Sequence, residues 1–206
     1  MKLVGMNPVI IHGGGPQIGK ELSKAGLESE FIGGLRVTTK SVMSVVKKIL
    51  GTQINHEIVR LIKHFGGNAI SFNHNKYSII RATKRNNDAG PDLGYVGKVQ
   101  KILTGEIKKK IDNGFIPVIA PIGKSKNNDY WNINADVVAG EVAQSLKAEK
   151  LILLTDVKGI GDSENKLISK ISLKKGQKVL KEKFIKGGMT PKLTAALEAK
   201  KNGVKS

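Results

Sequence analysis

The sequence contains no cysteine and few aromatic residues, and each shortage excludes a class of protein. Without cysteine there is no disulfide framework, thiolate nucleophile or cysteine metal site. Aromatic residues make up 4% of the chain, too few for a platform on which nucleic-acid bases stack. No run of 18 or more apolar residues occurs, so no segment is predicted to span a membrane. We therefore expect a cytoplasmic protein without a membrane partner.

The chain has about half as many acidic residues as basic ones, 17 compared with 35, which gives a net charge of +18. Arginine occurs only at positions 36, 60, 81 and 85, so lysine makes up the other 31 basic residues. Arginine is the preferred residue for phosphate and base-edge recognition, and these lysines are spread along the chain. We interpret them as solvated surface and expect no nucleic-acid partner, although a positive field would attract small anions.

Apolar runs alternate with segments of helical spacing along the chain. Strands are predicted over 8–11, 94–102, 116–123 and 150–156, and the last of these is expected to be buried on both faces. Helices are predicted over 17–25, 39–50, 54–65, 104–113, 136–146 and 191–201. Residues 69–72 and 77–82 are predicted to pair as a hairpin, and 31–39, 84–92 and 158–166 to be loops. The alternation predicts the α/β class with a mostly parallel sheet.

The first loop at a predicted strand end is His12–Gly15, three glycines that open a helix. Glycines let the backbone approach an anion, and the helix adds its positive end. From Gly14 the sequence also resembles a P-loop, but Glu21 stands where that motif needs Ser or Thr for Mg²⁺. Lys20 falls within the predicted helix and is expected at the surface. We reject the P-loop and keep an anion-binding turn or an ordinary turn as alternatives.

Two further loops carry candidate residues at a strand end or a helix start. Asn132, Asn134 and Asp136 alternate before a helix, and either face one site or serve as turn and N-cap residues. Asp156 follows the predicted 150–156 strand, where the base or ribose of a nucleotide could bind, or where the strand simply ends in a turn.

Two basic residues follow paired glycines at a short distance in the sequence. Lys192 lies in the first turn of the helix that follows Gly187 and Gly188. A cation at this position is unfavourable with respect to the helix dipole, which suggests that Lys192 has a role beyond surface charge. Arg36 follows Gly34, and its guanidinium suits a carboxylate, with a surface role as the alternative.

Together these segments resemble the acetylglutamate kinases of the amino acid kinase family. The resemblance runs from about Asn7 to Ser206 through HGGGPQI, GLRVTT, DLGYVGKV, IPVIAPIG, NINAD, KLILLTDVKGI and GGMTPK, of which GLRVT with NINAD is the most specific pairing. It implies a three-layer α/β sandwich with a mostly parallel central sheet. The resemblance also implies that ATP, together with Mg²⁺, phosphorylates the side-chain carboxylate of N-acetyl-L-glutamate, a step of arginine synthesis. It further implies that the protein forms a homodimer or a larger homo-oligomer.

The resemblance implies site roles at positions where this sequence matches the family's motifs. They are Gly14, Gly15, Arg36 and Asn132 for acetylglutamate and the phosphoryl group, Asp136 and Lys192 for catalysis, and Thr155, Asp156, Gly159 and Gly188 for the nucleotide. No residue is expected to ligate a metal directly. A single domain is expected, with an acetylglutamate lobe over about 1–125, a hairpin lid near 68–100 and an ATP lobe over about 126–206.

The sequence departs from the family at both ends. The family's K-x-G-G strand, whose lysine reaches the phosphoryl group, occurs nowhere in these residues, and the final strand and helix are not found. We therefore expect a fold truncated at both ends and little kinase activity from the chain as it stands. The alternatives are an acetylaminoadipate kinase and a non-catalytic binding or assembly homologue.

Overall fold

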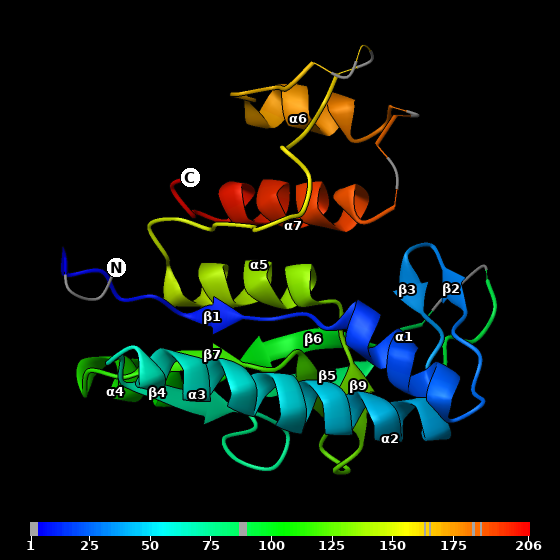
Figure 1. Ribbon diagram of the computed structural model, residues 1–206. Helices are drawn as coiled ribbons and strands as arrows, with labels where there is room; N and C mark the ends of the chain where they lie inside the picture. Colours follow the sequence, from blue (N-terminus) through cyan, green and yellow to red (C-terminus); the bar gives the residue numbers. More distant parts are fainter. Residues whose placement is uncertain (1–3, 87–89, 163, 165, 183, 186) are drawn as a thin grey trace. The chain divides into compact units, whose positions relative to one another are not determined.

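The computed structural model describes residues 4–86, 90–162, 164, 166–182, 184–185 and 187–206 (Figure 1). The chain divides into two compact units, which we name the first unit (Met1–Val138) and the second unit (Ala139–Ser206). The boundary falls inside helix α5 (Ala135–Leu146).

The first unit contains most of the regular structure. Its elements are β1 (Ile10–Ile11), α1 (Gly15–Lys24), β2 (Phe31–Ile32), β3 (Leu35–Arg36), α2 (Lys40–Lys48), the π-helical segment η2 (Ile49–Ile54), α3 (Asn55–His64), β4 (Ala69–Phe72), β5 (Ile80–Lys84), β6 (Gly97–Ile102), α4 (Thr104–Asp112), β7 (Ile116–Ile119), β8 (Ile122–Lys124) and β9 (Tyr130–Asn132). The second unit contains α6 (Leu173–Val179) and α7 (Met189–Lys201).

A parallel sheet of order β1-β7-β4 lies at the centre of the first unit. Its residues are apolar apart from Ser71 of β4, and Val118 in the middle strand is fully buried. Helix α3 covers one face, where Ile58, Val59 and Ile62 pack against Ala69 and Val118. The predicted α/β class with a parallel central sheet is confirmed.

The predicted hairpin between 69–72 and 77–82 is wrong. Strand β4 pairs with β7 in the parallel sheet, whereas β5 pairs with β6 in a second sheet of order β6-β5-β8-β9. Asn73 separates the two strands, because its side-chain oxygen accepts hydrogen bonds from the backbone N–H groups of Asn75 and Lys76 and turns the chain. The antiparallel pair in this region is therefore β5 with β6.

Two other strand predictions also need correction. Residues 116–123 form two strands in different sheets, β7 and β8, with Pro121 between them, since proline has no N–H to donate to a ladder. Residues 31–39, predicted as a loop, contain the antiparallel pair β2–β3. Its two turn residues, Gly33 and Gly34, have φ of 57° and 80°, as a tight hairpin turn requires.

The helices predicted over 39–50 and 54–65 form one continuous helical run through α2, η2 and α3. Thr39 caps its start, accepting a hydrogen bond from the Val42 N–H at 3.3 Å. Within η2, Gly51 has no side chain, and the imidazole of His74 occupies the space where a Cβ would stand. The expected break is thus replaced by a π-helical segment that accommodates a neighbouring side chain.

The second unit has a helical core. Leu193 and Leu197 of α7 pack against Val179 of α6, and Gly176 of α6 lets the Leu197 side chain approach closely. The sequence did not predict α6, because its lysine-rich residues show no apolar periodicity.

The buried strand predicted over 150–156 is wrong. Two backbone hydrogen bonds join this segment to Ser206 in the pattern of a parallel bridge. The Ser206 N–H donates to the Glu149 carbonyl at 3.3 Å, and the Leu151 N–H donates to the Ser206 carbonyl at 2.8 Å. No strand among the described residues continues that pairing, and Ile152 and Leu154 are 58% and 87% exposed. An apolar run is buried as a strand only where neighbours flank it on both sides.

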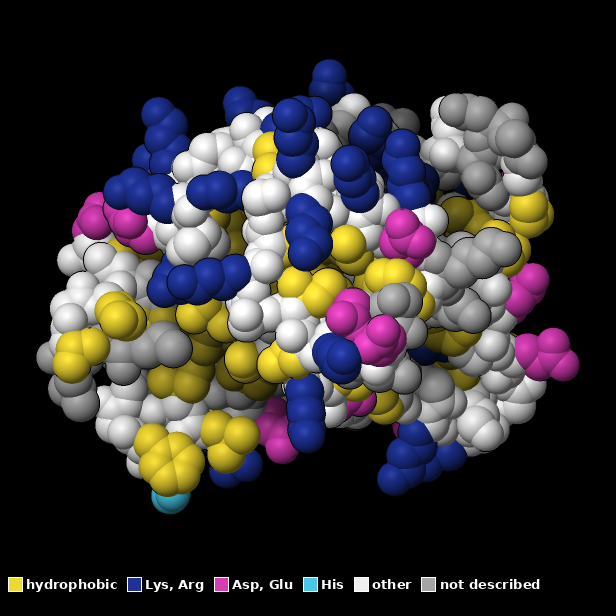
Figure 2. Space-filling model, turned by 90° about the horizontal axis from the view of Figure 1, so that it is seen from above, with side chains coloured by type: hydrophobic (Ala, Val, Ile, Leu, Met, Phe, Trp, Pro, Cys, Tyr) yellow, Lys and Arg dark blue, Asp and Glu magenta, His cyan; other side chains and the backbone are white. Residues whose placement is uncertain are grey.

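Lysine dominates the charged surface. Figure 2 shows Lys and Arg side chains spread over much of one face, with few Asp and Glu side chains among them. Among the residues that the structure describes, no helix has the length and apolar character needed to cross a bilayer.

Candidate active site

The glycine loop His12–Gly15 lies at the carboxyl end of β1 and leads into α1. A Cβ on Gly14 would collide with the terminal methyl groups of Leu50 and Ile54 in η2, so a larger residue here would have to displace them. A Cβ on Gly15 would have no atom of the described chain within 4 Å. The loop is therefore packed against the protein at Gly14 and open at Gly15, where the first turn of α1 presents backbone N–H groups.

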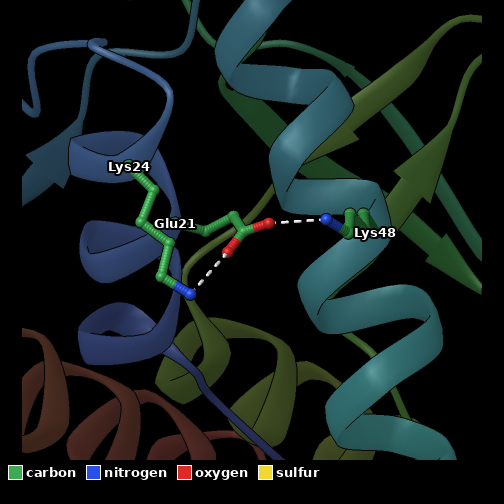
Figure 3. Close-up of polar contacts among 3 residues, drawn as sticks. All are labelled: Glu21, Lys24 and Lys48. Atoms are coloured by element: carbon green, nitrogen blue, oxygen red, sulfur yellow. Dashed lines mark hydrogen bonds and ion pairs between the residues drawn. The ribbon is translucent and has the colours of Figure 1, made fainter.

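The second half of the P-loop-like stretch is helix surface, as predicted. Gly19 and Lys20 lie within α1, and Lys20 is exposed. The Glu21 carboxylate contacts Lys48 of α2 at 2.5 Å and Lys24 at 3.7 Å (Figure 3). The hydrogen bond from Lys48 lowers the pKa of Glu21 below its ordinary value. Glu21 thus connects two helices and is not oriented as a metal ligand would be.

Arg36 is a buried cation beside the glycine loop. It is 9% exposed, its Nη2 donates to the Gly15 carbonyl at 3.1 Å, and its Nη1 donates to the Ser29 hydroxyl. The Phe31 ring lies 4.5 Å from its Cζ. Burial lowers the pKa of the guanidinium, and within the described ranges no carboxylate forms an ion pair with it. A buried guanidinium without a carboxylate favours binding of an anion.

Thr38 connects Arg36 to Asn132. Its hydroxyl donates to the Arg36 carbonyl at 2.8 Å and accepts from Asn132 Nδ2 at 3.1 Å. Thr38 is fully buried, and its backbone N–H and carbonyl bond to Leu93 and Tyr95. The structure thus brings Gly15, Arg36 and Asn132 into one hydrogen-bonded cluster. The sequence did not single out Thr38, since only its position after Arg36 marks it.

Helix α5 begins beside the glycine loop. The Asn134 side-chain oxygen accepts from the N–H groups of Asp136 (2.9 Å) and Val137 (3.2 Å), so Asn134 caps the helix and Asp136 lies in its first turn. The alternative that made Asp136 the N-cap is therefore wrong. Ala135 lies 3.8 Å from where a Gly13 Cβ would stand, which places the starts of α1 and α5 together. Two helix N-termini favour negative charge at this point.

The remaining predicted residues lie in the second unit. Thr155 and Asp156 are exposed, and the Thr155 hydroxyl donates to the Asp156 carboxylate at 3.3 Å. Gly159 has φ of 142°, and a Cβ there would lie 2.8 Å from Leu167. Gly188 precedes α7, and Lys192 lies in its first turn, half-buried.

The described residues contain no group of three His, Asp or Glu side chains that could hold a metal ion. They therefore do not form a protein cage for Mg²⁺. This ion often keeps its waters and binds through substrate phosphates with one or two carboxylates.

Comparison with known proteins gives four informative matches. The model of the amino acid kinase family matches residues 1–206. An acetylglutamate kinase of Ruthia magnifica subsp. Calyptogena magnifica is 48% identical over 211 residues, covering 100% of this chain and 71% of that protein. The solved structure of smu.665 from Streptococcus mutans UA159 is 33% identical with a TM-score of 0.90, covering 98% of this chain and 80% of its own. A carbamate kinase from Giardia has the same fold, with a TM-score of 0.65 at 19% identity and coverage of 98% and 76%.

Proposed function

The chain belongs to the amino acid kinase family, and on that basis we propose that it transfers the γ-phosphoryl group of ATP to the side-chain carboxylate of N-acetyl-L-glutamate, the second step of arginine biosynthesis. Curated relatives at 42–48% identity bear the name acetylglutamate kinase, which supports this substrate over acetylaminoadipate and over a non-catalytic role. The buried guanidinium of Arg36, with no carboxylate partner among the described residues, is the observation that carries the proposal.

Acetylglutamate would bind at the cluster around Thr38. The Arg36 guanidinium would pair with a substrate carboxylate, and the Asn132 amide would donate a second hydrogen bond. Both groups are held before the substrate arrives. The Gly15 carbonyl and the Ser29 hydroxyl bond the guanidinium, and Thr38 bonds both the Asn132 amide and the backbone carbonyl of Arg36. Such preorganisation reduces the conformational freedom that binding has to remove.

The reacting groups would meet at the glycine loop. A carboxylate oxygen attacks the γ-phosphorus, the bond to the β–γ bridging oxygen breaks, and ADP leaves. The N–H groups of Gly14 and Gly15 would stabilise charge on the transferring group, with Lys192 on the bridging oxygen. Asp136 would orient Lys192. The start of α5 lies beside the loop, which supports a place for Asp136 near the transferring group.

The nucleotide would bind along the second unit, at Thr155, Asp156, Gly159 and Gly188. We also propose an acetylglutamate lobe over about 1–125, with a lid near 68–100, and an ATP lobe over about 126–206. The division between the compact units falls in the chain between Val138 and Ala139. Mg²⁺ would arrive with the ATP phosphates and neutralise their charge. We also propose a cytoplasmic location, where ATP is available.

A homodimer or larger homo-oligomer is supported by one surface of the first unit. Strand β4 is an edge strand of the parallel sheet, and an edge presents unpaired backbone groups. Helix α3, which packs on β4, ends near Leu61 and Phe65, which are 41% and 82% exposed. An open edge beside exposed apolar side chains suits a second copy of the chain.

The experiment is a binding titration combined with hydroxylamine trapping of an acyl phosphate, on the purified 206-residue chain. We expect saturable binding of N-acetyl-L-glutamate and weaker binding of N-acetyl-L-aminoadipate, whose side chain is one methylene longer. Trapped hydroxamate should require both ATP and N-acetyl-L-glutamate. Failure to bind N-acetyl-L-glutamate would overturn the proposal. Binding without any hydroxamate would favour the non-catalytic alternative.

A further inference from the structure

His12 opens the glycine loop and has no role in the proposed reaction. It follows β1, is 7% exposed, and its two ring nitrogens each have a hydrogen-bond partner. Nδ1 lies 3.1 Å from the carbonyl oxygen of Gly13, and Nε2 lies 3.1 Å from Nδ2 of Asn55 at the start of α3. Burial lowers the pKa of His12, so the ring is neutral at pH 7. A neutral imidazole has one donor and one acceptor nitrogen, and the neighbours decide which is which.

The contacts of Asn55 fix the position of the proton. Asn55 is fully buried, its Nδ2 donates to the Val118 carbonyl at 3.0 Å, and its Oδ1 accepts from the Ser71 hydroxyl. A carbonyl only accepts, so the nitrogen of the Asn55 amide must face Val118 and also His12. His12 Nε2 is therefore the acceptor, and the ring proton lies on Nδ1, where it donates to the Gly13 carbonyl.

This hydrogen bond sets the orientation of one peptide group in the loop. In a trans peptide the carbonyl and the following N–H point in opposite directions, and no described peptide bond is cis. Holding the Gly13 carbonyl against the buried ring turns the Gly14 N–H away from it. Within the described residues, no backbone acceptor is bonded to that N–H. Contact with Leu50 and Ile54 restricts Gly14 from the other side.

We propose that His12 is a positioning residue of the glycine loop: its imidazole, oriented by Asn55, holds the Gly13 carbonyl inward and aims the Gly14 N–H at a phosphoryl group of the nucleotide. The inference rests on the proposed function, since it assigns the ligand of that N–H. Ser71 and Asn73 extend the support, because the Asn73 Nδ2 donates to the Ser71 hydroxyl at 2.9 Å. The hydrogen bonds thus run from the loop to the end of β4.

Two substitutions separate the two nitrogens of the ring. His12→Asn keeps an amide N–H at the same bond distance from the backbone as Nδ1, whereas His12→Gln places its amide near the position of Nε2. We expect His12→Gln to weaken ATP binding about tenfold or more, because the Gly13 carbonyl loses its donor. His12→Asn should stay within about threefold of the wild type, and both variants should bind N-acetyl-L-glutamate normally.

The matched control is His64→Gln, the same substitution at an exposed histidine at the end of α3, outside the hydrogen-bonded chain that supports the loop. It should leave ATP binding unchanged. The ¹⁵N NMR spectrum of the wild-type ring provides a readout that needs no variant, and we expect a protonated Nδ1. A protonated Nε2, or ATP binding by folded His12→Gln as tight as that of the wild type, overturns the inference. If the wild type binds neither ATP nor N-acetyl-L-glutamate, the proposed function itself fails.

Discussion

His12–Gly15 leads into α1 and Gly187–Gly188 leads into α7, and the two glycine loops differ in what surrounds them. In the first, Gly14 is pressed against Leu50 and Ile54, and the buried His12 holds the next carbonyl. In the second, no atom of the described residues lies within 4 Å of a Cβ built on either glycine, and Gly187 is favoured by its φ of 56°.

The same difference extends through the two units. Among the described residues, the buried polar side chains His12, Arg36, Thr38, Asn55 and Asn73 all lie in the first unit, where hydrogen bonds join them to strand ends. The predicted nucleotide residues Thr155 and Asp156 are exposed. The first unit is thus preorganised for its ligand, and we expect the second to gain order from ATP. The following changes test that contrast.

The largest effect is expected from one methyl group on the first loop. Gly14→Ala places a Cβ into Leu50 and Ile54, and overpacking of this kind costs about 1–3 kcal/mol of unfolding free energy. ATP binding should be lost with the loop geometry. Thermal unfolding and an ATP titration measure the two effects. Gly15→Ala and Gly188→Ala, which meet open space, should both fold normally. Equal stability of all three variants would contradict the difference in packing between the two glycine loops.

Removing one cation from the first unit should affect substrate affinity, whereas removing one from the second unit should affect the reaction rate. Arg36→Ala should weaken N-acetyl-L-glutamate binding about 100-fold, because a charge-assisted hydrogen-bond pair is lost. Lys192→Ala should leave that affinity within about twofold and slow hydroxamate formation about 100-fold, because it acts on the transferring group. Calorimetry and the trapping assay separate the two.

Arg36→Lys serves as the control for charge. A lysine lacks the planar fork of donors, so intermediate affinity is expected. Loss of N-acetyl-L-glutamate binding in Lys192→Ala would show that the two units do not divide the ligands in this way.

The sequence predicted local structure well where a residue's own chemistry decides it, and poorly where a partner decides it. Helices α1 and α4 were found within two residues of their observed bounds, since apolar spacing and a following glycine define them. The 150–156 run looked like a buried strand, but burial depends on neighbours that the described second unit does not provide. Pairing of β4 with β7 depends in the same way on a strand more than 40 residues away.

The candidate site shows the same limit. Motif positions identified Arg36 and Asn132, and the structure joins them through hydrogen bonds. The motif gave no reason to choose Thr38, because its role comes from the Asn132 amide on another strand. Asn55 was missed likewise, since a buried amide at a helix start is recognised only from its contacts with His12 and Val118.

Thr38 offers a smaller and more specific test of the first unit. Thr38→Val keeps the shape and removes the hydroxyl, so Asn132 and Arg36 lose their common partner, and N-acetyl-L-glutamate binding should weaken about tenfold. Thr38→Ser retains the hydroxyl and should restore most of the affinity. ATP affinity should be unchanged in both variants. Equal binding by Thr38→Val and the wild type would show that Thr38 serves packing alone.

The smallest effect is expected at the Glu21 ion pairs, which join α1 to α2 at the surface rather than at the site. Lys48 lowers the pKa of Glu21 in the folded chain, so the pair stabilises the fold above the unfolded pKa and loses that effect as pH falls through the lowered value. Glu21→Gln should therefore lower Tm slightly near pH 7, and the difference should vanish in acid and shrink at high salt. Lys48→Gln should lower Tm by a similar amount, and the Tm of the double variant should be no lower than that of either single variant. A Tm difference that persists in acid would mean that Glu21 acts through packing, because its charge would then have no part in holding α1 against α2.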